Sequence, residues 1–209
     1  MTKFDLLVTG VGGQGVILAS DIISEAALMA GYDVKKTDTL GMAQRGGSVI
    51  SNVRIADVVR SPLINAGEVD ILLSFEKLEA ARWSQHLRPG GIAIINNHAM
   101  PPQSVSLGKE RYPGDEEIAN LLKQRTDRVY FIDGTRRAEE LGNIRAVNTF
   151  MLGCVSAFLP LNEPVWKDCI SRHLPEKIRQ INLTIFDQGR KETESALTGA
   201  LPPLHRNGE

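Results

Sequence analysis

The stretch Phe4-Asp-Leu-Leu-Val-Thr9, followed directly by Gly10-Val-Gly-Gly-Gln-Gly15, decides the fold of this 209-residue chain. The first six residues are mostly apolar and end at a glycine, as is typical of a strand buried in a parallel sheet. The next six match the pattern Gly-x-Gly-x-x-Gly. Apolar residues then recur at helical spacing over 15–30, and Gly31 marks the expected helix end. A strand, a glycine loop and a helix in this order predict an α/β domain.

Strands and helices continue to alternate outward from this segment. We expect further strands at 32–39, 48–55, 69–74, 92–96 and 129–133, with 48–55 at a sheet edge and 89–91 as a turn. We expect helices at 76–87, 115–125 with Asp115 as N-cap, 144–159, 165–173 and 176–194, and a loop at 97–112. The pattern predicts a single Rossmann-like, three-layer domain over 1–197, with a mostly parallel sheet and a C-terminal helical extension. The polar, proline-bearing tail 198–209 is expected to be disordered.

Composition excludes several classes of function. Lys and Arg number 24 against 25 Asp and Glu, so the chain lacks the basic excess of a nucleic-acid-binding protein. Two cysteines cannot supply the four thiolates of an iron–sulfur cluster, and the four histidines show no metal-binding spacing. We therefore expect no metal site and no catalytic residue on this chain. Nothing resembles a signal peptide or a membrane span, and we expect a cytoplasmic protein that does not contact membranes.

The first glycine loop is a candidate binding segment. Glycines allow backbone N–H groups to approach an anion at the positive end of a helix. One interpretation is binding of NAD or FAD, with Asp38 holding a ribose hydroxyl. The alternative is that the glycines only let strand and helix pack closely. The polar Gln14, and a strand that continues past Asp38, count against a dinucleotide.

The second glycine loop reads Gly41-Met-Ala-Gln-Arg-Gly-Gly-Ser48. A simple turn needs one glycine rather than three, and Arg45 could bind a carboxylate or phosphate with two parallel hydrogen bonds. The alternative is an exposed turn with a weak surface ion pair. We favour a functional loop that shares one sheet edge with the first loop. Glu76 follows a later strand at the same edge, although an N-terminal helix acid would look the same.

Several segments together resemble one family. They are GVGGQG at 10–15, GMAQRGGSV at 41–49, SPLI at 61–64, DILLSFE at 70–76, RPGG at 88–91 and AVN at 146–148. In this order they resemble the gamma-type subunit or domain of 2-oxoacid:ferredoxin oxidoreductases. Within that family they are most similar to the beta subunit of indolepyruvate:ferredoxin oxidoreductase. The resemblance spans about residues 4–190.

The resemblance implies an enzyme that oxidatively decarboxylates a 2-oxoacid, forms an acyl-coenzyme A and reduces ferredoxin. Thiamine diphosphate, Mg²⁺ and [4Fe-4S] clusters would lie on a larger partner subunit, with coenzyme A at the interface and ferredoxin reached through the complex. This chain would be inactive alone. Two alternatives remain: a free-standing NAD- or FAD-dependent oxidoreductase, and a non-catalytic assembly or regulatory subunit. The residues expected to face ligand or partner are Gly10, Gly12, Gly13, Gln14, Gly15, Met42, Gln44, Arg45, Gly46, Gly47, Ser48, Glu76 and Asn148.

Overall fold

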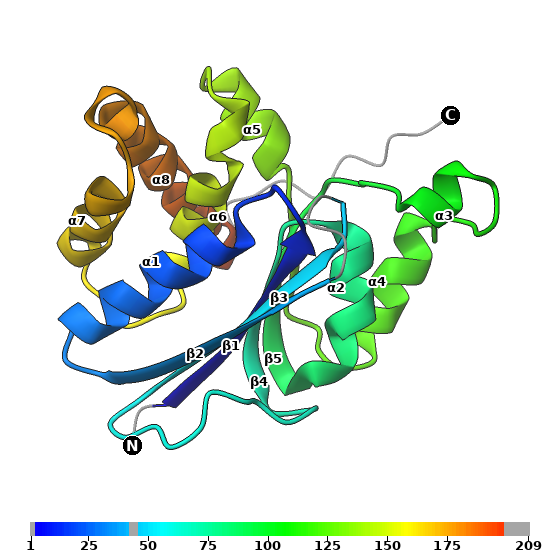
Figure 1. The fold of residues 1–209 in the computed structure, drawn as a ribbon, viewed down its shortest axis with the longest axis horizontal. Helices are drawn as coiled ribbons and strands as arrows, with labels where there is room; N and C mark the ends of the chain where they lie inside the picture. The colour runs from blue at the N-terminus through cyan, green and yellow to red at the C-terminus, as the bar shows by residue number, and fades with distance from the viewer. Residues whose placement is uncertain (1–2, 42–45, 199–209) are drawn as a thin grey trace.

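The computed structural model describes residues 3–41 and 46–198, which form one sheet of six strands between two helical layers (Figure 1). The strand order across the sheet is β2-β3-β1-β4-β5-β6. In chain order the strands are β1 Lys3–Val11, β2 Asp33–Leu40, β3 Ser48–Ala56, β4 Val69–Ser74, β5 Leu87–Asn96 and β6 Val129–Ile132. This arrangement confirms the predicted three-layer α/β fold.

The sheet is mostly parallel, with one reversed strand. β1, β4, β5 and β6 pair in parallel, whereas β3 is antiparallel to both β1 and β2. The prediction that residues 48–55 form an edge strand was wrong, since β3 lies between β2 and β1. Its alternating pattern reflects burial on both faces: Val53 packs into one core and Ile50 into the other. The edge strand on that side of the sheet is β2, which is half-exposed and polar.

Helices cover both faces of the sheet and divide the core in two. On one face lie α1 (Val16–Met29), α6 (Val147–Ser156), α7 (Glu163–His173) and α8 (Glu176–Leu197), over the larger cluster of buried apolar residues. On the other face lie α2 (Lys77–Trp83) and α4 (Asp115–Lys123), over a smaller cluster. The helical extension after Ile144 thus completes one layer of the fold.

Two glycines bring helices α6 and α8 into backbone contact. A Cβ added to Gly153 of α6 would lie 2.1 Å from the carbonyl oxygen of Phe186, and one added to Gly189 of α8 would lie 2.1 Å from that of Phe150. Carbon and oxygen atoms normally approach no closer than about 3.3 Å. Only glycine therefore allows the extension to pack this tightly.

The structure corrects several predicted boundaries. Gly114 is the N-cap of α4, and Asp115 is its first residue. The expected turn at 89–91 lies inside β5, where the register with β4 shifts. The expected loop 97–112 contains the single-turn helix α3 (Gln103–Ser106), and helix α5 (Gly134–Glu140) was not predicted. Short 3-10 turns at Ser84–His86 and Ile144–Ala146 occupy parts of the expected helices 76–87 and 144–159.

Two further points concern the extent of the chain. Residues 199–209 lie outside the described part, so both the disordered tail and the domain boundary at 197 stay predictions. Within the described residues, no helix combines the length and apolar character needed to cross a bilayer. The cytoplasmic location also stays a prediction.

Candidate functional site

The two glycine loops lie side by side at the carboxyl ends of the strands. The Gly12 N–H donates a 2.9 Å hydrogen bond to the Gly47 carbonyl, and the Gly41 N–H donates to the Ser48 carbonyl at 3.0 Å. The loops share this edge because β1 and β2 run in the same direction, although β3 separates them. The predicted proximity of the loops is confirmed. Its cause is a hairpin between antiparallel strands, and not two neighbouring parallel ones.

The edge is also the topological switch point of the sheet. The chain leaves β1 towards β2 on one side, while β4 and β5 continue on the other side. Open α/β sheets bind ligands in the crevice at such a point. Here the Gln14 side chain spans it: its Oε1 accepts the Val11 N–H at 2.8 Å, and its Nε2 donates to the Phe75 carbonyl at 3.2 Å. Gln14 therefore joins the first loop to the end of β4.

The Phe75 carbonyl accepts a second amide at the same point. Asn96, which is 1 % exposed at the end of β5, donates from Nδ2 to that oxygen at 3.1 Å and to the Thr135 hydroxyl at 2.9 Å. Its Oδ1 accepts the Thr135 N–H. Gln14, Phe75, Asn96 and Thr135 form what we term the amide bracket, which links β1, β4, β5 and α5. Asn96 is not among the predicted site residues, because only the fold brings its partners together.

Asn148 covers the beginning of helix α1. It lies in the first turn of α6 and is 7 % exposed. Its amide packs so closely on Gly15 that a Cβ there would lie 2.8 Å from Nδ2. Gly15 is also the N-cap of α1 with a φ of 82°. The structure thus brings Asn148 to the first glycine loop, where its amide packs on Gly15; that it faces a ligand or partner stays a prediction.

The geometry disfavours a dinucleotide at this edge. Strand β2 is two positions from β1, so its residues lie about 5 Å further from β1 than those of an adjacent, ribose-binding strand would. Asp38 is also engaged, since its carboxylate accepts the Ser51 hydroxyl at 2.6 Å and the Lys36 ammonium at 2.9 Å.

Glu76 is a buried helix cap. It is the N-cap residue of α2 and is 1 % exposed, and its Oε2 accepts the Glu79 N–H at 2.9 Å. Its Oε1 accepts the Met100 N–H at 3.0 Å and the Tyr112 hydroxyl. Burial, and then the hydrogen bond to Glu76, raise the pKa of Tyr112 above its ordinary value. Glu76 therefore fastens the segment between β5 and α4 to the edge.

A second carboxylate on α2 contacts the second loop. Glu79 is 2 % exposed, its Oε2 accepts the Ser48 hydroxyl at 2.5 Å, and its Oε1 is 2.6 Å from the Arg82 guanidinium. Ser48 begins β3, directly after the loop glycines. The sequence carried no signal for this pair, because the two residues lie 31 positions apart in different elements.

The remaining loop positions divide into two groups. Gly13 and Gly46 have φ values of 104° and 79°, so the backbone turns themselves require glycine. Met42, Gln44 and Arg45 lie outside the described residues, and their predicted contacts stay predictions.

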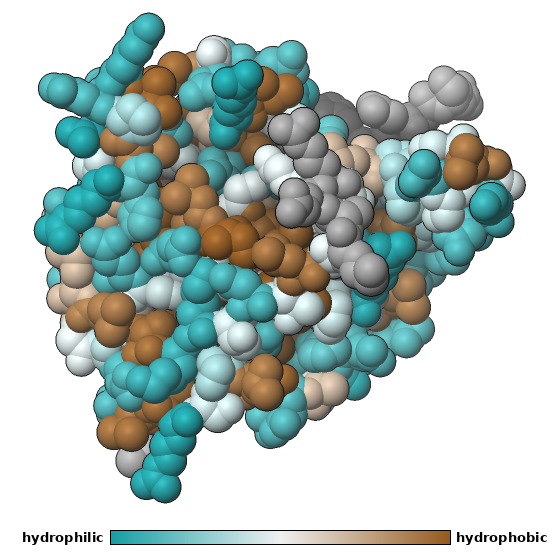
Figure 2. Space-filling model, in the orientation of Figure 1, coloured by the Kyte–Doolittle hydropathy of each residue, from teal (hydrophilic) through white to brown (hydrophobic). Residues whose placement is uncertain are grey.

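Apolar side chains border the loops. A hollow of about 320 Å³ is lined by Gly12, Gly13 and Gly15 together with Val11, Val16, Ile17, Leu40 and Val49. Leu40 is 66 % exposed at the end of β2. Figure 2, in the orientation of Figure 1, shows apolar surface near the middle of the molecule. The edge therefore combines apolar groups with exposed backbone.

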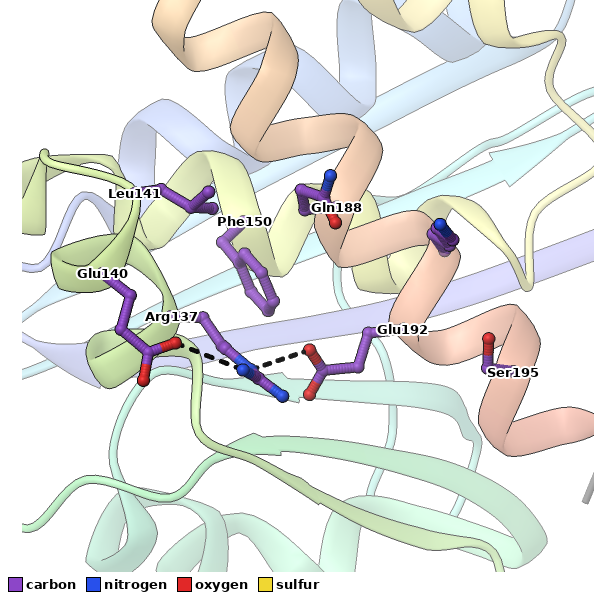
Figure 3. Close-up of a pocket in the computed structure, with 8 residues that line it drawn as sticks. Arg137, Glu140, Leu141, Phe150, Gln188, Glu192 and Ser195 are labelled. Atoms are coloured by element: carbon purple, nitrogen blue, oxygen red, sulfur yellow. Dashed lines mark hydrogen bonds and ion pairs between the residues drawn. The ribbon is translucent and has the colours of Figure 1, made fainter. Parts of the chain in front are cut away.

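A second hollow of about 290 Å³ lies between α5 and α8 (Figure 3). Arg137 crosses it, with Nε 3.1 Å from Glu192 and Nη1 3.2 Å from Glu140. These carboxylates, Glu192 first, raise the pKa of the guanidinium. Arg137 is thus already paired with two carboxylates that line the same hollow, and we assign the hollow no ligand.

The described residues do not fit a resident metal or iron–sulfur cofactor. Among residues 3–41 and 46–198, no three His, Cys, Asp or Glu side chains lie together as metal ligands. Both cysteines are buried, and they lie in different helices, α6 and α7. Burial raises the pKa of Cys154 to about 12 and that of Cys169 to about 11, so both thiols are protonated at neutral pH.

Comparison of the sequence with known proteins gives matches along nearly its whole length. A family model described as pyruvate ferredoxin/flavodoxin oxidoreductase matches residues 5–192. Indolepyruvate oxidoreductase subunit IorB of Pyrococcus horikoshii is 35 % identical over 200 residues, covering 94 % of this chain and 99 % of that protein. The pyruvate/ketoisovalerate oxidoreductases common subunit gamma of Pyrococcus furiosus is 28 % identical over 175 residues, covering 80 % and 87 %.

Solved structures share the fold. The gamma subunit of keto/oxoacid ferredoxin oxidoreductase from Geobacter sulfurreducens superposes with a TM-score of 0.68 at 22 % identity, covering 92 % of this chain and 99 % of that one. The 2-oxoglutarate:ferredoxin oxidoreductase from Magnetococcus marinus, solved with 2-oxoglutarate, coenzyme A and succinyl-CoA bound, gives 0.72 at 21 % identity. The match covers 93 % of this chain but 32 % of that one, so there the fold is one part of a longer polypeptide.

Proposed function

The chain belongs to the pyruvate ferredoxin/flavodoxin oxidoreductase family, and on that premise we propose that it is the small subunit of a 2-oxoacid:ferredoxin oxidoreductase. The observation that carries the proposal is the full-length similarity to indolepyruvate oxidoreductase subunits. We propose indolepyruvate or a related 2-oxoacid as the substrate of the complex. The products are an acyl-coenzyme A, carbon dioxide and reduced ferredoxin.

The reactive cofactors belong to the partner in this proposal. The described part of this chain offers no ligand group for a metal ion or cluster, and both thiols are buried and protonated. Thiamine diphosphate, Mg²⁺ and [4Fe-4S] clusters would come from a larger subunit, with coenzyme A binding near the interface. The small chain would contribute a binding surface, and would be inactive alone.

We propose that the edge carrying the two glycine loops faces that larger subunit. It is preorganised by the amide bracket and by the hydrogen bond between Gly12 and Gly47, so little backbone must be ordered on binding. The apolar hollow beside it matches the apolar centre of a protein interface. Glycine leaves the loop backbone accessible for hydrogen bonds to the partner or to a ligand held between the subunits.

Co-expression tests this function. The chain is purified together with a large thiamine-binding partner subunit, and 2-oxoacid-dependent reduction of methyl viologen is measured with coenzyme A. We expect turnover with indolepyruvate for the complex and none for either subunit alone. An Arg45→Ala variant should lower turnover or assembly, and normal values for both would contradict a role for the second loop.

The same experiment separates the two alternatives. A purely regulatory or assembly role predicts that the large subunit is active without this chain. A free-standing dehydrogenase predicts that the isolated chain binds NAD or FAD at micromolar concentrations. Asp38 would be essential for that binding, and calorimetry on the isolated chain measures it directly.

A further inference from the structure

The buried carboxylate of Glu79 has an unusual position for its place in helix α2. Glu79 is the third residue of the helix, where an acidic side chain commonly reaches back to the N–H of the N-cap residue and completes a capping box. Here the N-cap residue Glu76 instead donates its N–H to the Ser74 hydroxyl, at 3.4 Å. The Glu79 carboxylate is turned away from its own helix end and towards strand β3.

The partner of Glu79 is the residue at which the second glycine loop ends. Ser48 donates its hydroxyl to Glu79 at 2.5 Å, and its carbonyl accepts the Gly41 N–H from the other end of the loop. The preceding Gly47 accepts the N–H of Gly12. The exit of the second loop is thus held on one side by α2 and on the other by the first loop.

Burying a carboxylate is costly unless it is paired and hydrogen-bonded. Arg82, one helical turn further on, supplies the charge partner at 2.6 Å from Glu79, and is itself 44 % exposed. The hydrogen bond from Ser48 satisfies the other oxygen. Capping the helix would not require this arrangement, because Glu76 already accepts the Glu79 N–H. The arrangement is explained if the carboxylate serves the loop.

We infer that Glu79 is a positioning residue, which acts through the Ser48 hydroxyl to fix the exit of the second glycine loop in the form that the large subunit binds. The inference rests on the proposed function, since it assigns the glycine-loop edge to that partner. Without the Ser48 hydroxyl, the loop exit keeps its backbone hydrogen bonds but loses its contact with α2, so part of its backbone must be ordered when the subunits associate. Fixing the backbone of one residue costs enough to weaken association about tenfold.

The experiment uses the complex of small and large subunits, and circular dichroism first establishes that every variant is folded. Ser48→Ala should raise the dissociation constant of the two subunits about tenfold, and Ser48→Thr, which keeps the hydroxyl, should restore it. Ser51→Ala is the matched control. Ser51 lies in β3, as Ser48 does, and its hydroxyl donates a 2.6 Å hydrogen bond to the carboxylate of Asp38 in β2. Its removal leaves the hydrogen bond between Ser48 and Glu79 intact. Its dissociation constant should stay within about twofold of wild type.

Glu79→Gln separates positioning from a role in helix stability. If Glu79 acts through Ser48, the double variant Glu79→Gln/Ser48→Ala should bind the large subunit no more weakly than whichever single variant binds it less tightly. Additive losses, or a Ser48→Ala variant that associates normally, would overturn the inference. These results are distinguishable from failure of the proposed function. If the proposed function is wrong, the wild-type subunits would neither associate nor reduce viologen.

Discussion

The contact between α6 and α8 supports a prediction about stability. Gly153→Ala places a methyl carbon 2.1 Å from the Phe186 carbonyl oxygen, more than 1 Å inside normal contact, and 2.8 Å from the backbone nitrogen of Arg190. Both obstacles are backbone atoms of a helix, which cannot rotate away as a side chain can. The two helices must therefore separate along their whole contact.

The magnitude follows from two opposing effects. Overpacking a tight interior contact costs about 3 kcal/mol or more when only backbone can move. Alanine regains about 1 kcal/mol over glycine in a helix interior. The net loss is about 2 kcal/mol, which for a chain of this size lowers the melting temperature by about 4–8 °C. Urea unfolding and thermal scans of the isolated chain both measure it.

Gly114→Ala is the control for this substitution. An added Cβ at Gly114 meets nothing within 4 Å, and the residue lies at the N-cap of α4 with an ordinary φ of −70°. Its effect should be at most about 1 kcal/mol. Gly189→Ala should resemble Gly153→Ala, and the double variant should lose less than the sum, because one separation of the helices relieves both clashes. A Gly153→Ala variant as stable as wild type would refute this description of the contact.

Three further predictions concern buried and partly buried polar groups. Gln14→Leu removes the acceptor of the Val11 N–H and one of the two donors to the Phe75 carbonyl, which keeps its hydrogen bond from Asn96; it should lower the free energy of unfolding in urea by about 1–2 kcal/mol. Tyr112 has a raised folded-state pKa, so its contribution is complete below the unfolded pKa of about 10 and is lost as pH rises beyond it. Tyr112→Phe should remove this loss above about pH 10, and an unchanged pH profile would contradict the burial and the hydrogen bond to Glu76 that raise the pKa of Tyr112. Cys154 and Cys169 have pKa values of about 12 and about 11, so they should resist iodoacetamide at pH 8 until urea unfolds the chain. Mass spectrometry measures the modification, and alkylation of the native protein would contradict the burial of these thiols.

The local sequence pattern determined much of this protein. The order of strand, glycine loop and helix predicted the α/β class, because burial and helical periodicity are properties of neighbouring residues. The resemblance carried by the two glycine loops and four further segments indicated the family that the full-length matches then showed. Two cysteines are too few to supply the four thiolates of an iron–sulfur cluster, and this follows from composition alone.

Tertiary structure decided what the polar residues do. Gln14 looked like a ligand contact, yet its amide bridges β1 to Phe75, which is 61 positions away. Asn96 and Glu79 were not among the predicted site residues, although each is buried and joins separate elements. The place of β3 between β2 and β1 likewise depends on a hairpin folding back across the sheet. The hydrogen-bond partners of these residues depend on the strand order, because that order brings distant segments together. The spacing of residues along the chain does not determine the strand order.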